Sequence, residues 1–200
     1  SVLSKVLLGL CKYPGEDLAE DAQLSAEYLL SVYQPPDMTE FMPLFKKAGF
    51  YRILKRIYQV DKQYGKLIQT YFEDPDDREG VFSCIASCLR LSPGLTRRQI
   101  QDVHQVVKQH SAELVKLNPK MAARTIAKHA PELHQHVLNS LTPEPDLQFA
   151  YLKTVLESEA ESPSVAGPPD RDLVEQYVRL MCRFEPDHVS DYVSFVQSSD

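Results

Sequence analysis

The sequence predicts an all-α fold, a right-handed α-solenoid of stacked antiparallel helix pairs, and three observations lead to that prediction. Apolar residues recur three and four positions apart through most of the 200 residues, which is the period of an amphipathic helix. No segment alternates apolar and polar residues convincingly, so we expect no strand. The chain holds only seven glycines but fourteen prolines, most of them between the apolar stripes, where they separate short helices.

The apolar stripes place thirteen short helices along the chain. A typical stripe runs through Phe50, Ile53, Leu54 and Ile57, which share one face of a helix of two to three turns. The expected helices span residues 2–12, 16–33, 37–48, 50–59, 61–72, 78–91, 96–109, 111–117, 119–129, 131–141, 145–158, 170–184 and 187–197.

Residues that favour helix ends lie where these stripes begin and stop. Candidate N-caps, whose side chains accept hydrogen bonds from the first turn, are Asp37, Asp61, Asp77, Ser111 and Asn118. The first helical position tolerates proline, which suits Pro119, Pro131 and Pro186. Glycines stand in three of the breaks, at Gly15, Gly49 and Gly94.

The expected helices group into antiparallel pairs that repeat along the chain, and repeating helix pairs are typical of α-solenoids. A closed helical bundle is the alternative, but bundles use fewer and longer helices. We therefore expect residues 1–200 to form a single solenoid segment of a larger protein. Residues 157–169 are rich in Glu, Ser and Pro and lack aromatic residues, so we expect a mobile surface loop there.

The stretch from Leu173 to Phe195 resembles the clathrin-heavy-chain repeat as it occurs in vacuolar sorting and tethering proteins. In that pattern an aromatic and apolar helix is followed by a proline and a second helix that ends in an aromatic residue. The matching residues are Tyr177, Leu180, Phe184, Pro186, Val189, Tyr192 and Phe195. Residues 41–76 have a similar character, and residues 131–141 with 147–156 form a third candidate pair.

The resemblance implies a subunit of the CORVET or HOPS tethering complexes. Its expected partners are the other subunits of such a complex and a Rab-type small GTPase. It implies a cytoplasmic location, with peripheral attachment to the endosome or vacuole membrane through partners. Coat proteins and nuclear-pore scaffolds share the same helical architecture and are the alternative within this class.

Composition argues against several other functions. The net charge of −6 gives no general attraction to nucleic acid, so we expect no nucleic-acid partner. No apolar run approaches the length of about 20 residues that a transmembrane helix needs. The four cysteines fall on apolar helical faces and contain no CxxC pair, which predicts buried free thiols.

The sequence contains no recognisable catalytic or metal site. Nucleophile elbows, phosphate-binding loops and dinucleotide fingerprints are missing, so we expect no enzyme activity and no cofactor. An all-helical enzyme with a dispersed site is the alternative. His129, His134 and His136 are expected to be surface or capping residues because their spacing does not converge on a metal. Cys84 and Cys88 are expected in the core.

One charge pattern suggests a binding surface. Residues 46–66 carry seven positive charges against the single acidic residue Asp61, and an acidic run follows over residues 73–79. These cations either form an ordinary solvated helix face or a ridge that meets an acidic partner. The candidate partner-binding residues are Lys47, Arg52, Lys55, Arg56 and Lys62.

These observations together predict a non-catalytic scaffold segment that works in vesicle trafficking and fusion through protein–protein interaction. A nucleic-acid-binding helical repeat is a further alternative, but such proteins expose aromatic residues among their cations. Here the tyrosines fall on the stripes that we expect to be buried.

Overall fold

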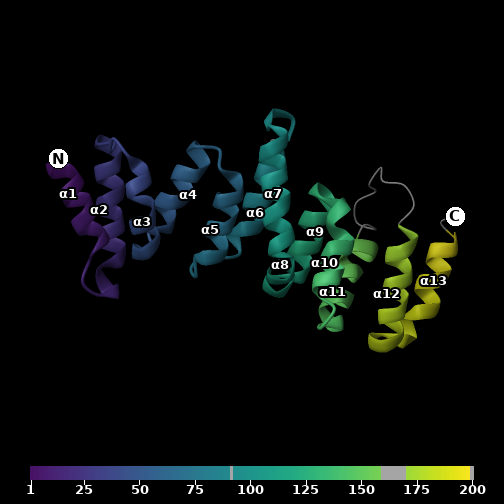
Figure 1. The fold of residues 1–200 in the computed structure, drawn as a ribbon. Coiled ribbons are helices and arrows are strands. Elements are labelled where there is room, and N and C mark those ends of the chain that lie inside the picture. Colours follow the sequence, from purple (N-terminus) through teal and green to yellow (C-terminus); the bar gives the residue numbers. More distant parts are fainter. Residues whose placement is uncertain (91, 159–169, 199–200) are drawn as a thin grey trace. The chain divides into compact units, whose positions relative to one another are not determined.

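The computed structural model describes residues 1–90, 92–158 and 170–198, and the described residues contain helices and no strand. The all-α prediction is therefore confirmed for this part of the chain. The chain divides into two compact units, here called unit 1 (residues 1–81) and unit 2 (residues from 82 onward). Figure 1 shows the order of their helices.

Unit 1 is built from five α-helices and two short 3-10 helices. In order they are α1 (Val2–Cys11), η1 (Glu16–Leu18), α2 (Ala19–Val32), η2 (Met38–Glu40), α3 (Met42–Ala48), α4 (Tyr51–Val60) and α5 (Tyr64–Glu73). Helix α1 contacts α2 and α3, α3 contacts α4, and α4 contacts α5. Most helices of unit 1 therefore pack against the next helix in the sequence, and α1 also reaches α3.

The core of unit 1 collects the apolar faces of α1 to α4. Its buried residues are Leu7, Ala22, Ala26, Phe41, Phe45, Ala48, Phe50, Ile53 and Leu54. The break between α3 and α4 is made by Gly49, whose φ of 74° is a left-handed conformation that glycine adopts without a steric penalty. This turn brings Phe50 back onto Phe45, with ring centroids 6.4 Å apart.

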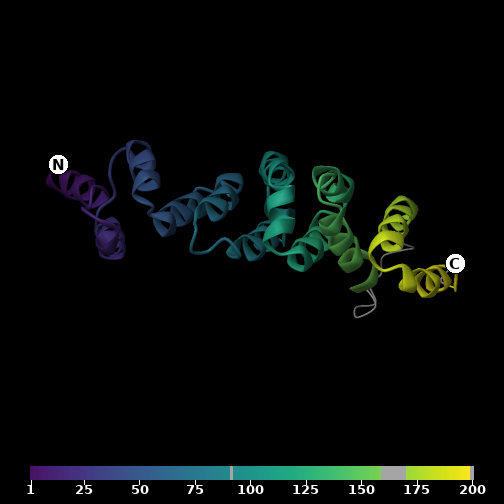
Figure 2. The same cartoon turned by 90° about the horizontal axis from the view of Figure 1, so that it is seen from below.

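Unit 2 continues the helical pattern. Its elements are α6 (Gly80–Arg90, which begins just before the unit boundary), η3 (Ser92–Gly94), α7 (Arg97–Gln109), α8 (Ser111–Leu117), α9 (Pro119–His129), η4 (Pro131–Leu133), α10 (His134–Ser140), α11 (Pro145–Glu157), α12 (Arg171–Phe184), η6 (Pro186–His188) and α13 (Val189–Ser198). Helix α11 packs beside both α9 and α12, as Figures 1 and 2 show.

Aromatic rings fix the packing of α11, α12 and α13. Phe149 stacks on Tyr177 with ring centroids 5.6 Å apart and on Phe184 at 5.4 Å. Tyr177 then meets Tyr192 edge to face at 5.0 Å. Pro186 opens the short helix η6, which leads into α13. Three aromatic residues of the repeat pattern, Tyr177, Phe184 and Tyr192, therefore help to hold these helices together.

The predicted helix starts have mixed outcomes. Asn118 is an N-cap as expected, since its side chain accepts a hydrogen bond from the backbone N–H of Met121, and Asp37 caps η2 in the same manner. The prediction for Asp61 is wrong because α4 ends there and α5 begins at Tyr64. The prediction for Ser111 is also wrong: its hydroxyl is buried and donates backward to the carbonyl of Val107.

Two further boundaries differ from the prediction. Helix α6 begins at Gly80 and not directly after Asp77, whose carboxylate lies 3.4 Å from the ammonium of Lys55. The expected loop over 157–169 starts too early, because Glu157 is the last residue of α11 and makes side-chain contacts with α12 and η6. Residues 159–169 of that loop lie outside the described residues.

Candidate functional site

Two of the predicted binding cations are engaged inside unit 1. The Arg52 guanidinium on α4 lies 2.9 Å from the Glu20 carboxylate and 2.8 Å from that of Glu27, both on α2. The hydrogen bond from Arg52 holds the pKa of the Glu20 carboxyl below its ordinary value. The backbone N–H of Arg52 also donates to the side chain of Gln23 at 3.1 Å. Arg52 therefore clamps α4 to α2.

Lys55 is more deeply buried than Arg52, and its acidic partners are Asp74 and Asp77. Its ammonium lies 2.7 Å from the carboxylate of Asp74, and the exposed fractions of the two side chains are 13% and 9%. The same ammonium lies 4.1 Å from the centre of the Tyr71 ring, in a cation–π arrangement. The acidic run after α5 thus neutralises a cation of α4 within the same unit.

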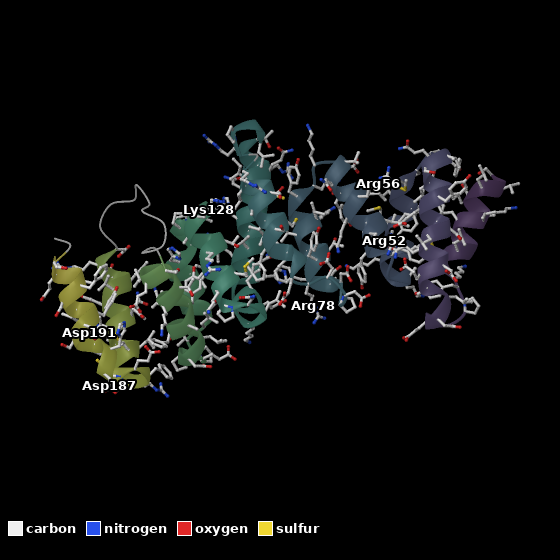
Figure 3. The ribbon with its side chains drawn as sticks, turned by 180° about the vertical axis from the view of Figure 1, so that it is seen from behind. Arg52, Arg56, Arg78, Lys128, Asp187 and Asp191 are labelled. Carbon is white, nitrogen blue, oxygen red and sulfur yellow. The ribbon has the colours of Figure 1, made fainter. Side chains whose placement is uncertain are left out.

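The other three predicted residues, Lys47, Arg56 and Lys62, are exposed and form no side-chain ion pair among the residues that the structure describes. Arg56 stands one helical turn after Arg52 on α4, and both are labelled in Figure 3. Of the five candidate residues, three are available to a partner and two are engaged within the fold.

Unit 1 also exposes apolar side chains on its first two helices. On α2 the residues Leu24, Tyr28 and Val32, spaced four apart, are 51%, 73% and 67% exposed. They lie on the opposite side of α2 from the buried Ala22 and Ala26. Helix α1 adds the exposed residues Val2, Leu3 and Val6. Exposed apolar residues that share one face of a helix, as on α2, are typical of an interaction surface.

A groove lies between α9 and α11 in unit 2. Its volume is about 510 Å³, and the residues that line it are Asn118, Pro119, Lys120, Arg124, Ala150, Lys153, Thr154, Glu157 and Ser158. Three of these are cations and one is an acid. Sequence analysis missed this groove because Lys120 and Lys153 are far apart in the chain. The spacing of Lys120 and Arg124, one turn apart after Pro119, was a signal, but it did not show which helix lies opposite.

Glu157 is the acidic residue of the groove, and its carboxylate is bound by side chains of α12 and η6. Tyr177 donates a hydrogen bond from its hydroxyl to Glu157, and the Nε2 atom of His188 lies 2.7 Å from the second carboxylate oxygen. The hydrogen bond between His188 and Glu157 raises the pKa of His188, while burial raises the pKa of Tyr177. The three side chains connect α11, α12 and η6.

The remaining histidine and cysteine predictions are partly corrected. His134 is buried, 8% exposed, and its Nδ1 atom lies 2.6 Å from the Tyr151 hydroxyl, so it is a core residue and not a surface one. Cys84 and Cys88 are buried as predicted, but Cys182 is exposed. His134 was misjudged because a polar residue that finds a buried partner has no distinct sequence signature.

Among the described residues, no group of three or more His, Cys, Asp or Glu side chains is placed to hold a metal ion. No helix in the described part of the chain is both long and apolar enough to cross a bilayer. The groove and the exposed surfaces of unit 1 are therefore the candidate sites.

Comparisons with known proteins give a consistent relationship. The chain is 30% identical over 198 residues to the vacuolar protein sorting-associated protein 8 homolog of Mus musculus, which covers 94% of this chain. It is 27% identical over 209 residues to the homolog of Homo sapiens, which covers 98% of this chain. The chain spans only 13% and 14% of the lengths of these two relatives.

No family model matches the chain, and no solved structure matches it. Among the tethering subunits that the repeat pattern resembles, the sequence taken as a whole predicts vacuolar protein sorting-associated protein 8. The relatives found by comparison confirm that resemblance. The chain is thus similar, along almost its whole length, to a segment of the vacuolar protein sorting-associated protein 8 homologues.

Proposed function

We propose that the chain is a non-catalytic scaffold segment of an endosomal or vacuolar membrane-tethering subunit, acting in vesicle trafficking and fusion. The observation that carries the proposal is its similarity over 94% of its length to a vacuolar protein sorting-associated protein. Its partners are other subunits of the tethering complex and a Rab-type small GTPase. It acts in the cytoplasm and reaches the endosome or vacuole membrane through those partners.

The contact pattern of the helices supports a scaffold of stacked pairs. Several helices contact the next helix in the sequence, as α3 does with α4 and α11 does with α12. We infer from these contacts that the helices of each unit stack as pairs of the α-solenoid type. Such a fold presents a long surface for its length, which suits binding to several proteins.

The exposed apolar residues of unit 1 support binding by surface burial. Burial of an apolar side chain contributes about 25 cal/mol per Å² removed from water, so Leu24, Tyr28 and Val32 would stabilise a complex. The exposed cations Lys47, Arg56 and Lys62 would meet acidic groups of the same or another partner. Arg52 and Lys55 would support this ridge by fixing α4 in place.

Co-purification from cells tests the proposal. The tagged protein is expected to recover other subunits of a tethering complex. Substituting Leu24→Glu and Tyr28→Glu, or Lys47→Glu and Arg56→Glu, is expected to reduce recovery, because all four side chains are exposed and none supports the core. The matched control is Arg97→Glu with Arg98→Glu, two exposed residues of α7.

The outcomes separate the proposal from its alternatives. Recovery of coat or nuclear-pore subunits in place of tethering subunits would show that the scaffold belongs to another assembly. Unchanged recovery with the Lys47→Glu and Arg56→Glu protein would show that these cations belong to an ordinary solvated helix face and do not bind the partner. Equal loss with the control pair would show that the effect comes from charge alone.

A further inference from the structure

We propose that the groove between α9 and α11 binds a short acidic and amphipathic segment of a partner protein. The inference deepens the proposed scaffold function, on which it rests for the class of the occupant, by assigning a site and a recognition chemistry within unit 2. It stands on the shape of the groove, on its apolar floor and on the imbalance of charge along its walls.

The groove has the size of a ligand-binding pocket and an apolar surface at its base. Its volume of about 510 Å³ falls within the range of about 300–1,000 Å³ that binding pockets show. Pro119 and Ala150 provide apolar surface, one from each helix. A simple inorganic anion would leave this floor unused, whereas an apolar side chain of a peptide would cover it.

The wall formed by α9 is positively charged, and its two cations have no acidic partner among the described residues. Lys120 and Arg124 are both exposed and lie one turn apart, so their side chains point to the same side of the helix. Neither forms an ion pair with any residue that the structure describes. The guanidinium of Arg124 can bind a carboxylate through two parallel hydrogen bonds. The positive end of the α9 dipole adds to the attraction.

The opposite wall, on α11, does not cancel this charge. Lys153 lies 2.7 Å from Glu185, which offsets its charge in part, so Lys120 and Arg124 are the two unpaired cations of the site. Glu157 has its carboxylate oxygens occupied by Tyr177 and His188. Of the lining residues, Lys120 and Arg124 are therefore the ones that can attract a carboxylate of a partner.

The two features together define the occupant. An apolar side chain would lie on Pro119 and Ala150, while neighbouring Asp or Glu residues would pair with Lys120 and Arg124. Exposed charge pairs contribute mainly through association rate and specificity, so binding is expected to weaken as the salt concentration rises. The apolar contact would supply the part of the affinity that does not depend on salt.

Binding of a defined peptide to the purified chain tests this site. The probe is a fluorescein-labelled peptide of four Glu-Glu-Leu repeats, measured by fluorescence anisotropy, and the control probe carries Gln in place of every Glu. Substituting Lys120→Glu and Arg124→Glu is expected to weaken binding by about tenfold or more, equivalent to about 1.4 kcal/mol. Both residues are exposed, and circular dichroism would confirm that the helices persist.

Two further variants separate the groove from general attraction. Arg97→Glu with Arg98→Glu makes the same change of net charge at two exposed residues of α7 outside the groove, and its binding is expected to stay within about twofold of the original chain. Ala150→Leu fills the groove without altering charge and suits a helix, so it is expected to weaken binding. Equal weakening by both double substitutions, or full binding by Ala150→Leu, would overturn the proposal.

A membrane surface is the other possible source of anionic groups. Vesicles of phosphatidylserine and phosphatidylcholine are therefore tested in parallel. Vesicle binding that requires Lys120 and Arg124, without binding of the Glu-Glu-Leu peptide, would show that the occupant is a lipid headgroup and would contradict the proposal. The co-purification experiment measures recovery of tethering subunits and does not depend on the Glu-Glu-Leu peptide. Failure of the peptide to bind would therefore contradict the groove assignment without contradicting the scaffold function.

Discussion

The ammonium of Lys55 lies 2.7 Å from the carboxylate of Asp74, and both side chains are almost wholly removed from water. Asp74 follows the last residue of α5, and its other carboxylate oxygen accepts a hydrogen bond from the backbone N–H of Asp76. The pair ties α4 to the turn that follows α5. Lys55, which the sequence suggested as a partner-binding residue, therefore stabilises the fold of unit 1.

Substituting Lys55→Ala is expected to lower the free energy of unfolding by about 3 kcal/mol, because Asp74 would keep a buried charge without a partner. The loss of the Tyr71 contact adds to this effect. Urea denaturation followed by circular dichroism measures the change. A loss below about 1 kcal/mol would show that water reaches Asp74 and replaces the ammonium.

Arg52→Ala provides the comparison, since Arg52 also joins two helices through carboxylates but is 46% exposed. Solvent screens such a pair, and its removal is expected to lower the free energy of unfolding by less than about 1 kcal/mol. A larger loss for Arg52→Ala than for Lys55→Ala would contradict the assignment of the buried pair as the stronger contact.

Substituting Gly80→Ala is expected to destabilise the protein by about 1–3 kcal/mol through overpacking. An added Cβ atom would lie 2.8 Å from a ring carbon of Tyr71 and 2.7 Å from a carboxylate oxygen of Asp77. The Tyr71 ring would have to move, and with it the contact to Lys55. Thermal unfolding measures the change.

Gly9→Ala is the matched control because a Cβ atom at Gly9, within α1, would meet nothing within 4 Å. Alanine favours the helix by about 0.5–1 kcal/mol over glycine, so this substitution is expected to stabilise the chain. A decrease in the free energy of unfolding for Gly80→Ala, together with an increase for Gly9→Ala, would confirm that the close approach at Gly80 causes the loss. A stabilised Gly80→Ala protein would show that Tyr71 can move freely.

The buried His134 makes stability depend on pH. Burial lowers the pKa of His134 below its ordinary value, and the nearby charges of Asp170 and Glu132 oppose this shift. The unfolded chain therefore binds a proton at a higher pH than the folded chain does. As the pH falls below about 6.5, the free energy of unfolding decreases through this residue.

The His134→Gln protein tests this expectation in urea denaturation at several pH values. The slope of the unfolding free energy against pH, between about pH 5 and 6.5, is expected to become flatter than in the original chain. His136→Gln is the control, because His136 is exposed. An identical slope in the original and His134→Gln chains would contradict a lowered pKa at His134.

The four thiols are expected to react at very different rates with a disulfide reagent such as dithionitrobenzoate. Cys182 is exposed and is expected to react first. Burial raises the pKa of Cys11 to about 11, which slows its reaction because the thiolate is the reactive form. A hydrogen bond from Cys84 lowers the pKa of Cys88, but both thiols are buried, so access limits them.

Replacing Cys182→Ser is expected to remove the fast phase of the thiol reaction and to leave the slow phases unchanged. Stopped-flow absorbance at the wavelength of the released thiolate measures both phases. A fast phase that persists in the Cys182→Ser protein would show that Cys11, Cys84 or Cys88 reacts faster than its burial predicts.

Helical periodicity, proline positions and aromatic spacing were enough to predict where most helices lie. Asn118 with Pro119 and the glycine at Gly49 illustrate why, since their effect on the backbone is local and needs no distant partner. Asp61 and Ser111 failed as N-caps because residues of this type also form other hydrogen bonds. Which of these bonds forms is decided by the packing around them.

The sequence by itself determined the helical class, the break at Gly49 and the resemblance to tethering subunits, because each depends on neighbours within a few residues or on a repeated pattern. Only the tertiary structure decided that Arg52 and Lys55 are held by acids of other segments, and that Lys120 faces Lys153 across a groove. The reason is that a charge is neutralised by whatever lies within a few ångströms, and folding sets that distance independently of separation along the chain.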